Sequence, residues 1–326
     1  MKAEGRNAGA EWTGLAPAPA PGKPGPGPIP EALLGALSLE VRRRIDGLLA
    51  GDYRSTFLGS GTEFSQVRPY AVGDDVRKID PGATARTGEP HVRVEVAEKV
   101  PVLWLVLDTS PSMHFGTARR RKADVAAGAT LAFAHLANRG GGRVGILTFG
   151  DREPLTVPPR GSRMGVLGLR KVLGREPEAS EVGATSVGDG LRRAGRLARR
   201  RSVVAVVSDF RGPRDWRVPL LEAASRHEVL AVEIRDPREN ELPDVGDLAL
   251  VDPETGRQLR VDTANRRLRQ RFAAEAARER EELARELRRT GAGHVVLSTG
   301  EDWLRTLATF LRRRAAHKPI RKGAPA

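Results

Sequence analysis

The stretch VPVLWLVLDTSPS, which runs from Val100 to Ser112, decides the fold of this chain. Its first part, Val100 to Leu107, is nearly all apolar, which is the pattern of a strand buried on both faces of a sheet. Polar residues begin at Asp108, where such a strand would end. Beyond this point short apolar runs alternate with helical patterns, and this alternation predicts βα units and a mainly parallel sheet. We therefore predict a doubly wound α/β domain over residues 100–316.

The same patterns place the other elements of this domain. The expected strands are Arg143–Phe149, Ser202–Val207, Val229–Ile234 and Val295–Ser298, with Glu153–Val157 as an antiparallel edge strand before Pro158, and with Leu248–Val251 and Gln258–Val261 as a hairpin. The expected helices are Arg120–Asn138, Ser162–Leu173, Gly188–Arg200, Asp215–Arg226, Asn265–Arg289 and Asp302–Ala315.

The chain before this domain divides into two parts. Residues 1–29 alternate Ala-Pro and Gly-Pro, which predicts a disordered, extended leader. Residues 30–99 are expected to form a helix, Pro30–Ala50, and a small β-rich flank with strands Thr62–Val67 and His91–Ala97. Within the flank, we interpret Gly73-Asp74-Asp75 as a turn closed by an ion pair with Arg77 rather than as a second metal site. Residues 317–326 form a basic tail.

Composition narrows the possible functions. The chain has 326 residues and a net charge of +14, and it contains no cysteine. Without cysteine there is no disulfide scaffold, no Cys-ligated zinc site and no thiol nucleophile. The longest strongly apolar run, Val100 to Leu107, is far shorter than the about 20 residues of a membrane-spanning helix. The N-terminus also lacks the apolar core of a secretory signal, so we expect a cytoplasmic protein.

Oxygen-bearing residues follow the ends of two predicted strands. Asp108, Ser110 and Ser112 follow the first strand, Asp209 follows the strand Ser202–Val207, and Thr185 lies in a loop before a helix. In an open α/β sheet, ligands bind outside the carboxyl ends of the strands. Two carboxylates and three hydroxyls without His or Cys suit Mg²⁺ or Mn²⁺ better than zinc or copper.

The pattern Asp108-x-Ser110-x-Ser112, with Thr185 and Asp209 downstream, resembles the metal-ion-dependent adhesion site of von Willebrand factor A domains. The resemblance covers about residues 100–315 and implies a doubly wound sheet with helices on both faces. It also implies that the five residues hold Mg²⁺ or Mn²⁺, and that an acidic residue of a partner protein completes the coordination. Ser110 and Ser112 would then ligate directly, with Thr185 as a further direct ligand, while Asp108 and Asp209 act partly through waters.

The flank resembles a second family, the domain of unknown function 58, in which it directly precedes an adhesion-type domain. The matching motifs are Gly59–Phe64, Arg68–Tyr70, Gly73–Asp80 and Ala85–Gly88, and Pro81 stands where members usually carry Trp. Members are typically encoded beside an AAA ATPase of the MoxR class. The resemblance therefore implies a non-catalytic adaptor or co-chaperone that works with a MoxR-type ATPase to remodel or mature a client protein.

Arginine-rich clusters leave a second class of function open. They comprise Arg192, Arg193, Arg196, Arg199, Arg200 and Arg201, and further on Arg312, Arg313, Arg314, Lys318, Arg321 and Lys322. Such clusters bind nucleic acid nonspecifically, or an acidic protein face, and the metal site would then be vestigial. They also lie at helix ends, where cations are favourable.

The sequence contains little that indicates an enzyme. Ser110, His114 and Asp209 could be combined into a hydrolase triad, but no Gly-x-Ser-x-Gly motif surrounds either serine of the metal loop. We therefore expect no catalytic activity.

Overall fold

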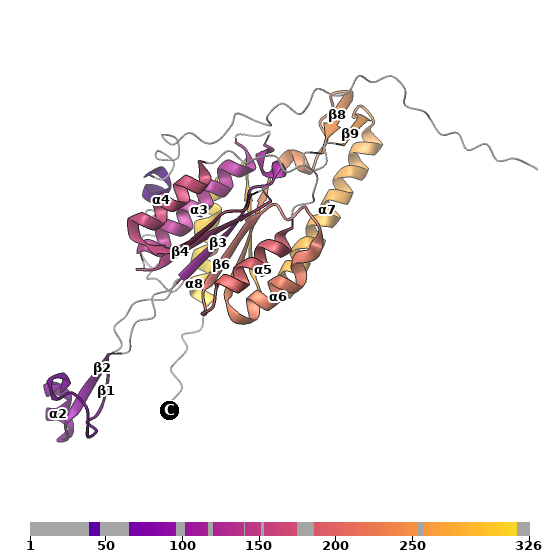
Figure 1. The fold of residues 1–326 in the computed structure, drawn as a ribbon. Helices are drawn as coiled ribbons and strands as arrows, with labels where there is room; N and C mark the ends of the chain where they lie inside the picture. Colours follow the sequence, from indigo (N-terminus) through magenta and orange to yellow (C-terminus); the bar gives the residue numbers. More distant parts are fainter. Residues whose placement is uncertain are drawn as a thin grey trace, which may run out of the picture.

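The computed structural model describes residues 39–45, 65–95, 102–116, 120–139, 141–150, 153–174, 186–252 and 257–317 (Figure 1). The residues from 102 onward form an α/β domain, and residues 65–95 form a small unit that is described by itself. The predicted leader over 1–29, most of the predicted helix Pro30–Ala50 and the basic tail beyond His317 lie outside the described residues.

A six-stranded sheet forms the centre of the α/β domain (Figure 1). Its strands lie in the order β10-β7-β6-β3-β4-β5. Neighbours pair in parallel, except that β5 is antiparallel to β4. The strands are β3 (Val102–Asp108), β4 (Arg143–Phe149), β5 (Thr156–Gly161), β6 (Val203–Ser208), β7 (Glu228–Arg235) and β10 (Gly293–Ser298). The predicted mainly parallel α/β sheet is thereby confirmed.

The central strands are buried on both faces, as their apolar sequences predict. Every residue of β6 is buried, and so is every residue of β3 after Val102. Along β3 the side chains alternate: Leu103 and Leu105 face one core, and Trp104 and Val106 face the other. The sheet therefore separates two hydrophobic cores.

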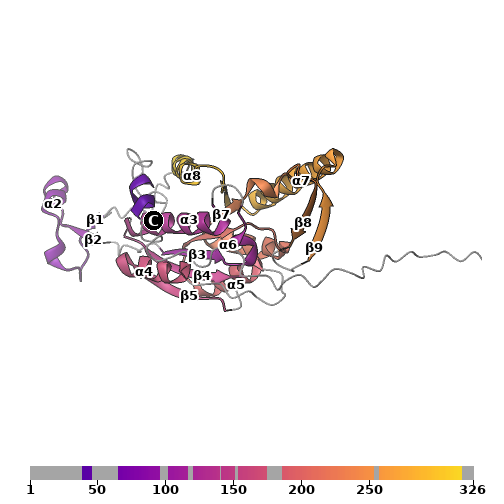
Figure 2. The same ribbon diagram turned by 90° about the horizontal axis from the view of Figure 1, so that it is seen from above.

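Helices cover both faces of the sheet (Figures 1 and 2). The first core contains side chains of α3 (Lys122–Arg139), α4 (Ser162–Leu173) and α8 (Trp303–His317), and of helical residues 39–45. The second core contains side chains of α5 (Val187–Leu197), α6 (Arg217–Arg226) and α7 (Arg266–Arg289). Each helix of the domain thus buries one face against the sheet, so the fold is doubly wound.

The described part of the N-terminal helix belongs to the first core. Val41 and Ile45 are 2% and 0% exposed, and both pack in that core. Arg44 also forms an ion pair of 2.7 Å with Asp302, just before α8. The predicted N-terminal helix is therefore attached to the α/β domain through its residues 39–45.

The edge strand β5 differs from its prediction. We expected a strand that ends before Pro158, but both Pro158 and Pro159 lie inside β5. Proline cannot donate a ladder hydrogen bond, and an edge strand tolerates this because one side of it has no neighbour. The pairing with β4 is irregular between Val144 and Ile146.

The small unit pairs β1 (Ser65–Pro69) with β2 (His91–Glu95) in antiparallel fashion, close to the predicted strands. It also contains α2 (Pro81–Thr87), a helix that the sequence analysis did not predict. Pro81 begins α2 and the Asp80 side chain caps it, which gives Pro81 a structural role at the position where it departs from the family pattern.

The predicted turn at Gly73-Asp74-Asp75 forms, but its ion pair differs from the prediction. Asp74 pairs with Arg68 at 2.6 Å rather than with Arg77. The side chain of Asp75 instead accepts a hydrogen bond from the Arg77 backbone N–H at 3.0 Å. Arg68 lies on the neighbouring strand β1, so the pair joins the turn to the sheet.

A second small sheet lies beside α7 in both views (Figures 1 and 2). It is the predicted hairpin, formed by β8 (Asp247–Val251) and β9 (Gln258–Asp262) in antiparallel pairing. Within the described part of the chain, no helix combines the length and the apolar character that crossing a bilayer requires.

We predict that Gly128→Ala lowers the free energy of unfolding by about 1 to 3 kcal/mol. A Cβ at Gly128 in α3 would lie 2.5 Å from Cζ2 of Trp303, a ring that is packed in the core. Gly195→Ala in α5 is the matched control, because a Cβ there meets no atom within 4 Å. The control is expected to gain up to about 1 kcal/mol from helix propensity. Urea unfolding measures the free energy of unfolding of both variants. An increase of the same size in Gly128→Ala as in Gly195→Ala would contradict close packing of α3 against α8.

Candidate metal centre

The end of β3 brings oxygen-bearing side chains together. Asp108 is the last residue of β3, and the short 3-10 helix η2 (Pro111–His114) follows it. The backbone N–H of Ser110 donates to Oδ1 of Asp108 at 2.9 Å, and the hydroxyl oxygens of Ser110 and Ser112 lie 3.1 Å apart. All three residues are buried. The chain therefore folds back over the strand end, as the Asp-x-Ser-x-Ser spacing predicts.

The neighbouring strand β6 adds the second carboxylate. Because β6 runs parallel to β3, both strands end at the same edge of the sheet. The hydroxyl of Ser208 donates to Oδ2 of Asp108 at 2.6 Å, and Asp209 follows directly. The hydroxyl of Ser112 hydrogen-bonds to the carboxylate of Asp209. Four predicted ligands, Asp108, Ser110, Ser112 and Asp209, are thus brought together in one buried cluster, here called the carboxyl-edge cluster.

Two unusual backbone conformations permit this close approach. Phe210, directly after Asp209, has φ = +54°, a left-handed conformation that residues other than glycine seldom adopt. Its ring is held edge-on against Trp216, with ring centroids 5.8 Å apart. Gly150, after β4, has φ = +82°, and a Cβ at this position would lie 3.0 Å from Oδ1 of Asp108. The conformation of Phe210 costs free energy, whereas glycine adopts a positive φ without strain.

Thr185, the fifth predicted ligand, lies outside the described residues, so its position stays a prediction. Its neighbour Ser186 caps α5 by accepting a hydrogen bond from the Asp189 N–H at 2.9 Å. The hydroxyl of Ser186 also donates to Oδ2 of Asp215 at 2.5 Å. The start of α5 is therefore tied to the segment that follows β6.

A lysine outside the predicted set lies against the cluster. Lys122, the first residue of α3, is 1% exposed. Its Nζ lies 2.6 Å from Oδ2 of Asp209 and 2.6 Å from Oε1 of Glu239. These partners are 87 and 117 residues away along the chain. No local sequence pattern signals such a contact, because only the tertiary fold brings the three segments together.

Glu239 is a second residue outside the predicted set, and its local structure does have a sequence signal. It ends the 3-10 helix η4 (Pro237–Glu239), whose N-cap is Asp236. The backbone N–H of Asp236 donates to Oε2 of Glu239 at 3.0 Å, which completes a capping box. The spacing Asp-x-x-Glu is close to the usual signature of this motif. With Oε2 held in this way, Oε1 faces Lys122.

The charges in the cluster are only partly balanced. Burial, and then the nearby charge of Asp209, raises the pKa of Asp108 to about 7. Burial would also raise the pKa of Asp209, but the Lys122 ammonium outweighs it and lowers that pKa below its ordinary value. Burial works against the charge of Lys122, yet Asp209 and Glu239 raise its pKa. Among the described residues Asp108 forms no ion pair, and its charge is the one left without a cation in the cluster.

The donor set fits a hard divalent cation. Carboxylate and hydroxyl oxygens are ligands that Mg²⁺ and Mn²⁺ prefer, whereas zinc and copper usually take His or Cys. No group of three or more His, Cys, Asp or Glu side chains in the described ranges could hold a metal, so any ion here depends on two carboxylates and neighbouring hydroxyls. A cation beside Asp108 would favour the ionised form of this carboxyl.

Family comparison matches residues 66–282 to the family described as protein of unknown function DUF58. An uncharacterized protein of Mycobacterium tuberculosis is 40% identical to this chain over 289 residues, which covers 87% of this chain and 90% of the relative. A protein of Mycobacterium bovis matches to the same extent. A shorter protein of Mycobacterium avium is 42% identical over 163 residues, covering 48% of this chain and 93% of the relative.

Solved structures give weaker similarities. BatB from Bacteroides thetaiotaomicron is 14% identical with a TM-score of 0.41, covering 66% of this chain and 99% of that one. The VWA domain of SpRpn10 is 15% identical with a TM-score of 0.35, covering 70% of this chain and 100% of that one. At this level the matches carry no argument about function.

We predict that Lys122→Met lowers the free energy of unfolding by about 3 to 5 kcal/mol, because it leaves the buried carboxylate of Asp209 without its cation, while Glu239 keeps only a longer ion pair of 3.4 Å with Arg211. The matched control is Arg278→Met in α7, which removes an exposed ion pair with Glu275 and should change stability little. Denaturant unfolding in chelator measures both. Similar stabilities for the two variants would show that Lys122 does not compensate Asp209 and Glu239.

The raised pKa of Asp108 predicts a pH dependence of stability in chelator. The folded protein binds this proton more tightly than the unfolded chain, whose Asp pKa is about 3.9. The free energy of unfolding should therefore fall as pH rises from about 4 to about 7. Asp108→Asn should flatten this slope and be more stable at pH 7.5 by about 2 to 4 kcal/mol. Asp244→Asn, which changes an exposed carboxylate, should keep the wild-type slope. An unchanged slope in Asp108→Asn would contradict the assignment.

Proposed function

We propose that this chain, which belongs to the DUF58 family, is a protein-interaction module that uses a divalent cation to bind its partner. The cation would be Mg²⁺ or Mn²⁺, held at the carboxyl edge of the sheet. The proposed ligands are Asp108, Ser110, Ser112, Thr185 and Asp209. The family description assigns no function, so the proposal depends on the chemistry of this site.

One observation carries the proposal: oxygens from two adjacent strand ends converge in a buried cluster that holds an unpaired carboxylate. Asp108 and Asp209 come from β3 and β6, and Ser110 and Ser112 complete the donor set. Burying an unpaired carboxylate is costly, and coordination of a metal ion is one way to compensate this cost.

When bound, the ion would supply a coordination position that an acidic side chain of the partner can fill. The charges of the surrounding protein residues determine how strongly this position attracts an acidic side chain. Ser110 and Ser112 are neutral ligands, so they reduce the charge of the ion less than further carboxylates would. Lys122 neutralises much of Asp209 and Glu239, which limits the excess of negative charge around a partner carboxylate.

We further propose that the partner is a MoxR-type AAA ATPase, and that this chain acts as its adaptor or co-chaperone in remodelling or maturing a client. The support is the resemblance of the flank motifs to DUF58 members, which are typically encoded beside such ATPases. The family match begins in the small unit and continues through most of the α/β domain, so the family model includes both parts.

Metal binding predicts a thermal shift. Millimolar Mg²⁺ or Mn²⁺ should raise the stability of the full chain by about 2.7 kcal/mol when its concentration is a hundredfold above the dissociation constant. Asp108→Ala should abolish this shift. Asp244→Ala should retain it, since Asp244 is exposed and pairs with Arg269. A shift of the same size in Asp108→Ala would place the ion elsewhere.

Partner binding is tested with the MoxR-type ATPase of the same organism. Binding to the full chain should be lost in chelator and in Asp108→Ala, and should weaken only moderately with salt. Binding that resists chelation but falls steeply with salt would instead favour the basic surface as the interaction site.

A further inference from the structure

A pocket of about 370 Å³ lies between α5 and α6. We call it the α5–α6 pocket. Arg196 lies in the last turn of α5 and Arg226 ends α6, just before β7 begins. The pocket therefore lies toward the amino end of β7, away from the carboxyl-edge cluster. Its lining residues are Leu191, Arg192, Gly195, Arg196, Pro219, Glu222, Ala223, Arg226 and His227.

Three arginines from two helices surround this pocket. Arg192 already has acidic neighbours, since its guanidinium lies 3.1 Å from Asp189 and 3.6 Å from Asp215. In the described part of the chain, neither Arg196 nor Arg226 forms an ion pair. Glu222 is the carboxylate that lines the pocket, so cations exceed anions there.

A buried histidine in the pocket wall has an unused polar atom. His227 is 7% exposed, and its Nδ1 is buried without a hydrogen-bond partner among the described residues. Such atoms are rare in folded proteins, because an unpaired buried polar group costs free energy. Burial, together with the charges of Arg226 and Arg201, lowers the pKa of His227, which reflects a locally positive environment.

A glycine opens the pocket on the α5 side. Gly195 is exposed inside α5, and a Cβ there would meet no atom within 4 Å. Glycine in a helix interior is less stable than alanine by about 1 kcal/mol. No close packing explains this glycine, but a side chain at this position would enter the pocket.

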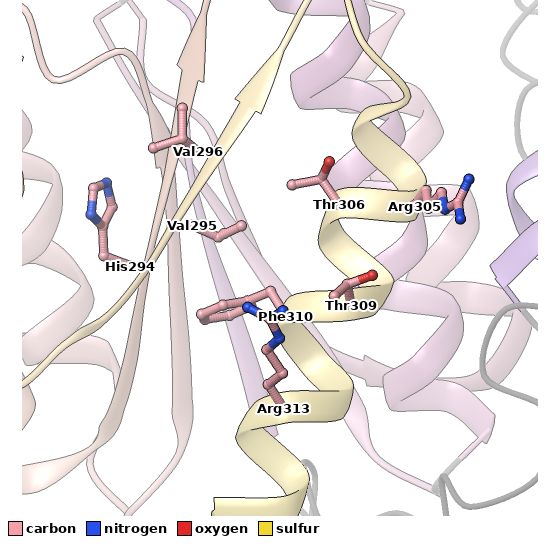
Figure 3. A pocket seen from close by; sticks show the side chains of 8 residues that line it. All are labelled: His294, Val295, Val296, Arg305, Thr306, Thr309, Phe310 and Arg313. Carbon is pink, nitrogen blue, oxygen red and sulfur yellow. The ribbon is translucent and has the colours of Figure 1, made fainter.

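A larger hollow of about 450 Å³ lies between β10 and α8, and it lacks these features (Figure 3). Its histidine, His294, already uses Nε2 in a contact of 2.8 Å with Glu233. Arg305 and Arg313 both come from α8, so the arginines of this hollow lie on one helix rather than on two (Figure 3). The α5–α6 pocket is therefore the stronger candidate for an anion.

We propose that the α5–α6 pocket binds the phosphate group of a small phosphorylated molecule. Guanidinium groups match phosphate oxygens in charge and geometry, and Arg196 and Arg226 reach the pocket from opposite walls. His227 also lines the pocket, and its buried Nδ1 has no hydrogen-bond partner among the described residues. Leu191, Pro219 and Ala223 provide apolar surface for the body of the molecule. The volume is in the range of small-molecule sites, whereas a polyanion would need an extended groove.

The test is calorimetric titration of the full chain with phenyl phosphate, in chelator so that the carboxyl-edge cluster plays no part. We expect one binding site per chain. Arg196→Gln and Gly195→Leu should each weaken binding by at least about tenfold. Gly195→Leu fills the pocket while improving helix propensity, so its unfolding temperature should not fall.

Arg199→Gln is the matched control, because Arg199 belongs to the same basic cluster but does not line the pocket. It should change the affinity less than about twofold. Equal losses in Arg196→Gln and Arg199→Gln would overturn the proposal, since a diffuse basic surface would then be responsible. The absence of saturable binding, or benzoate binding as tightly as phenyl phosphate, would overturn it as well.

Discussion

The buried ammonium of Lys122 is the interaction on which the carboxyl edge of this domain depends. It joins the start of α3 to Asp209 after β6 and to Glu239 after β7. Three chain segments thereby meet around a single charge in a region from which water is largely excluded. The contact between Lys122 and Asp209 is stable only as a pair, because either group left alone would be a buried, uncompensated charge, whereas Glu239 also has Arg211 beside it. The capping box between Asp236 and Glu239 also fixes the orientation of the Glu239 carboxylate that Lys122 contacts.

The same region shows why the candidate metal centre and the core cannot be separated. β3 and β6 are buried along their whole shared length, so the hydrophobic cores on both faces set where the two strands end. Asp108 and Asp209 come together because those ends coincide. The left-handed backbone at Phe210 is retained because its ring packs against Trp216 in the second core. Packing of the core therefore fixes the positions of the oxygen atoms at the carboxyl edge of the sheet.

Helix α5 connects the two regions that we consider functional. Its N-cap is Ser186, the residue that follows the predicted ligand Thr185 in sequence, and it ends near Arg196 in the wall of the α5–α6 pocket. The carboxyl-edge cluster has an excess of carboxylate over cations, and the pocket has an excess of guanidinium over carboxylate. One domain thus presents two sites of opposite charge, separated by the length of a short helix.

The sequence by itself determined the α/β fold, most helix and strand positions and four of the residues that meet at the sheet edge. It did so because apolar periodicity and the polar residues after each strand are local signals. It could not predict α2, a short helix defined mainly by its caps, nor the continuation of β5 through Pro158 and Pro159. Only the tertiary structure decided that Lys122 pairs with Asp209 and Glu239, and that Arg196 and His227 line one pocket. Those contacts join segments far apart in the chain, and their energies depend on burial, which no local pattern records.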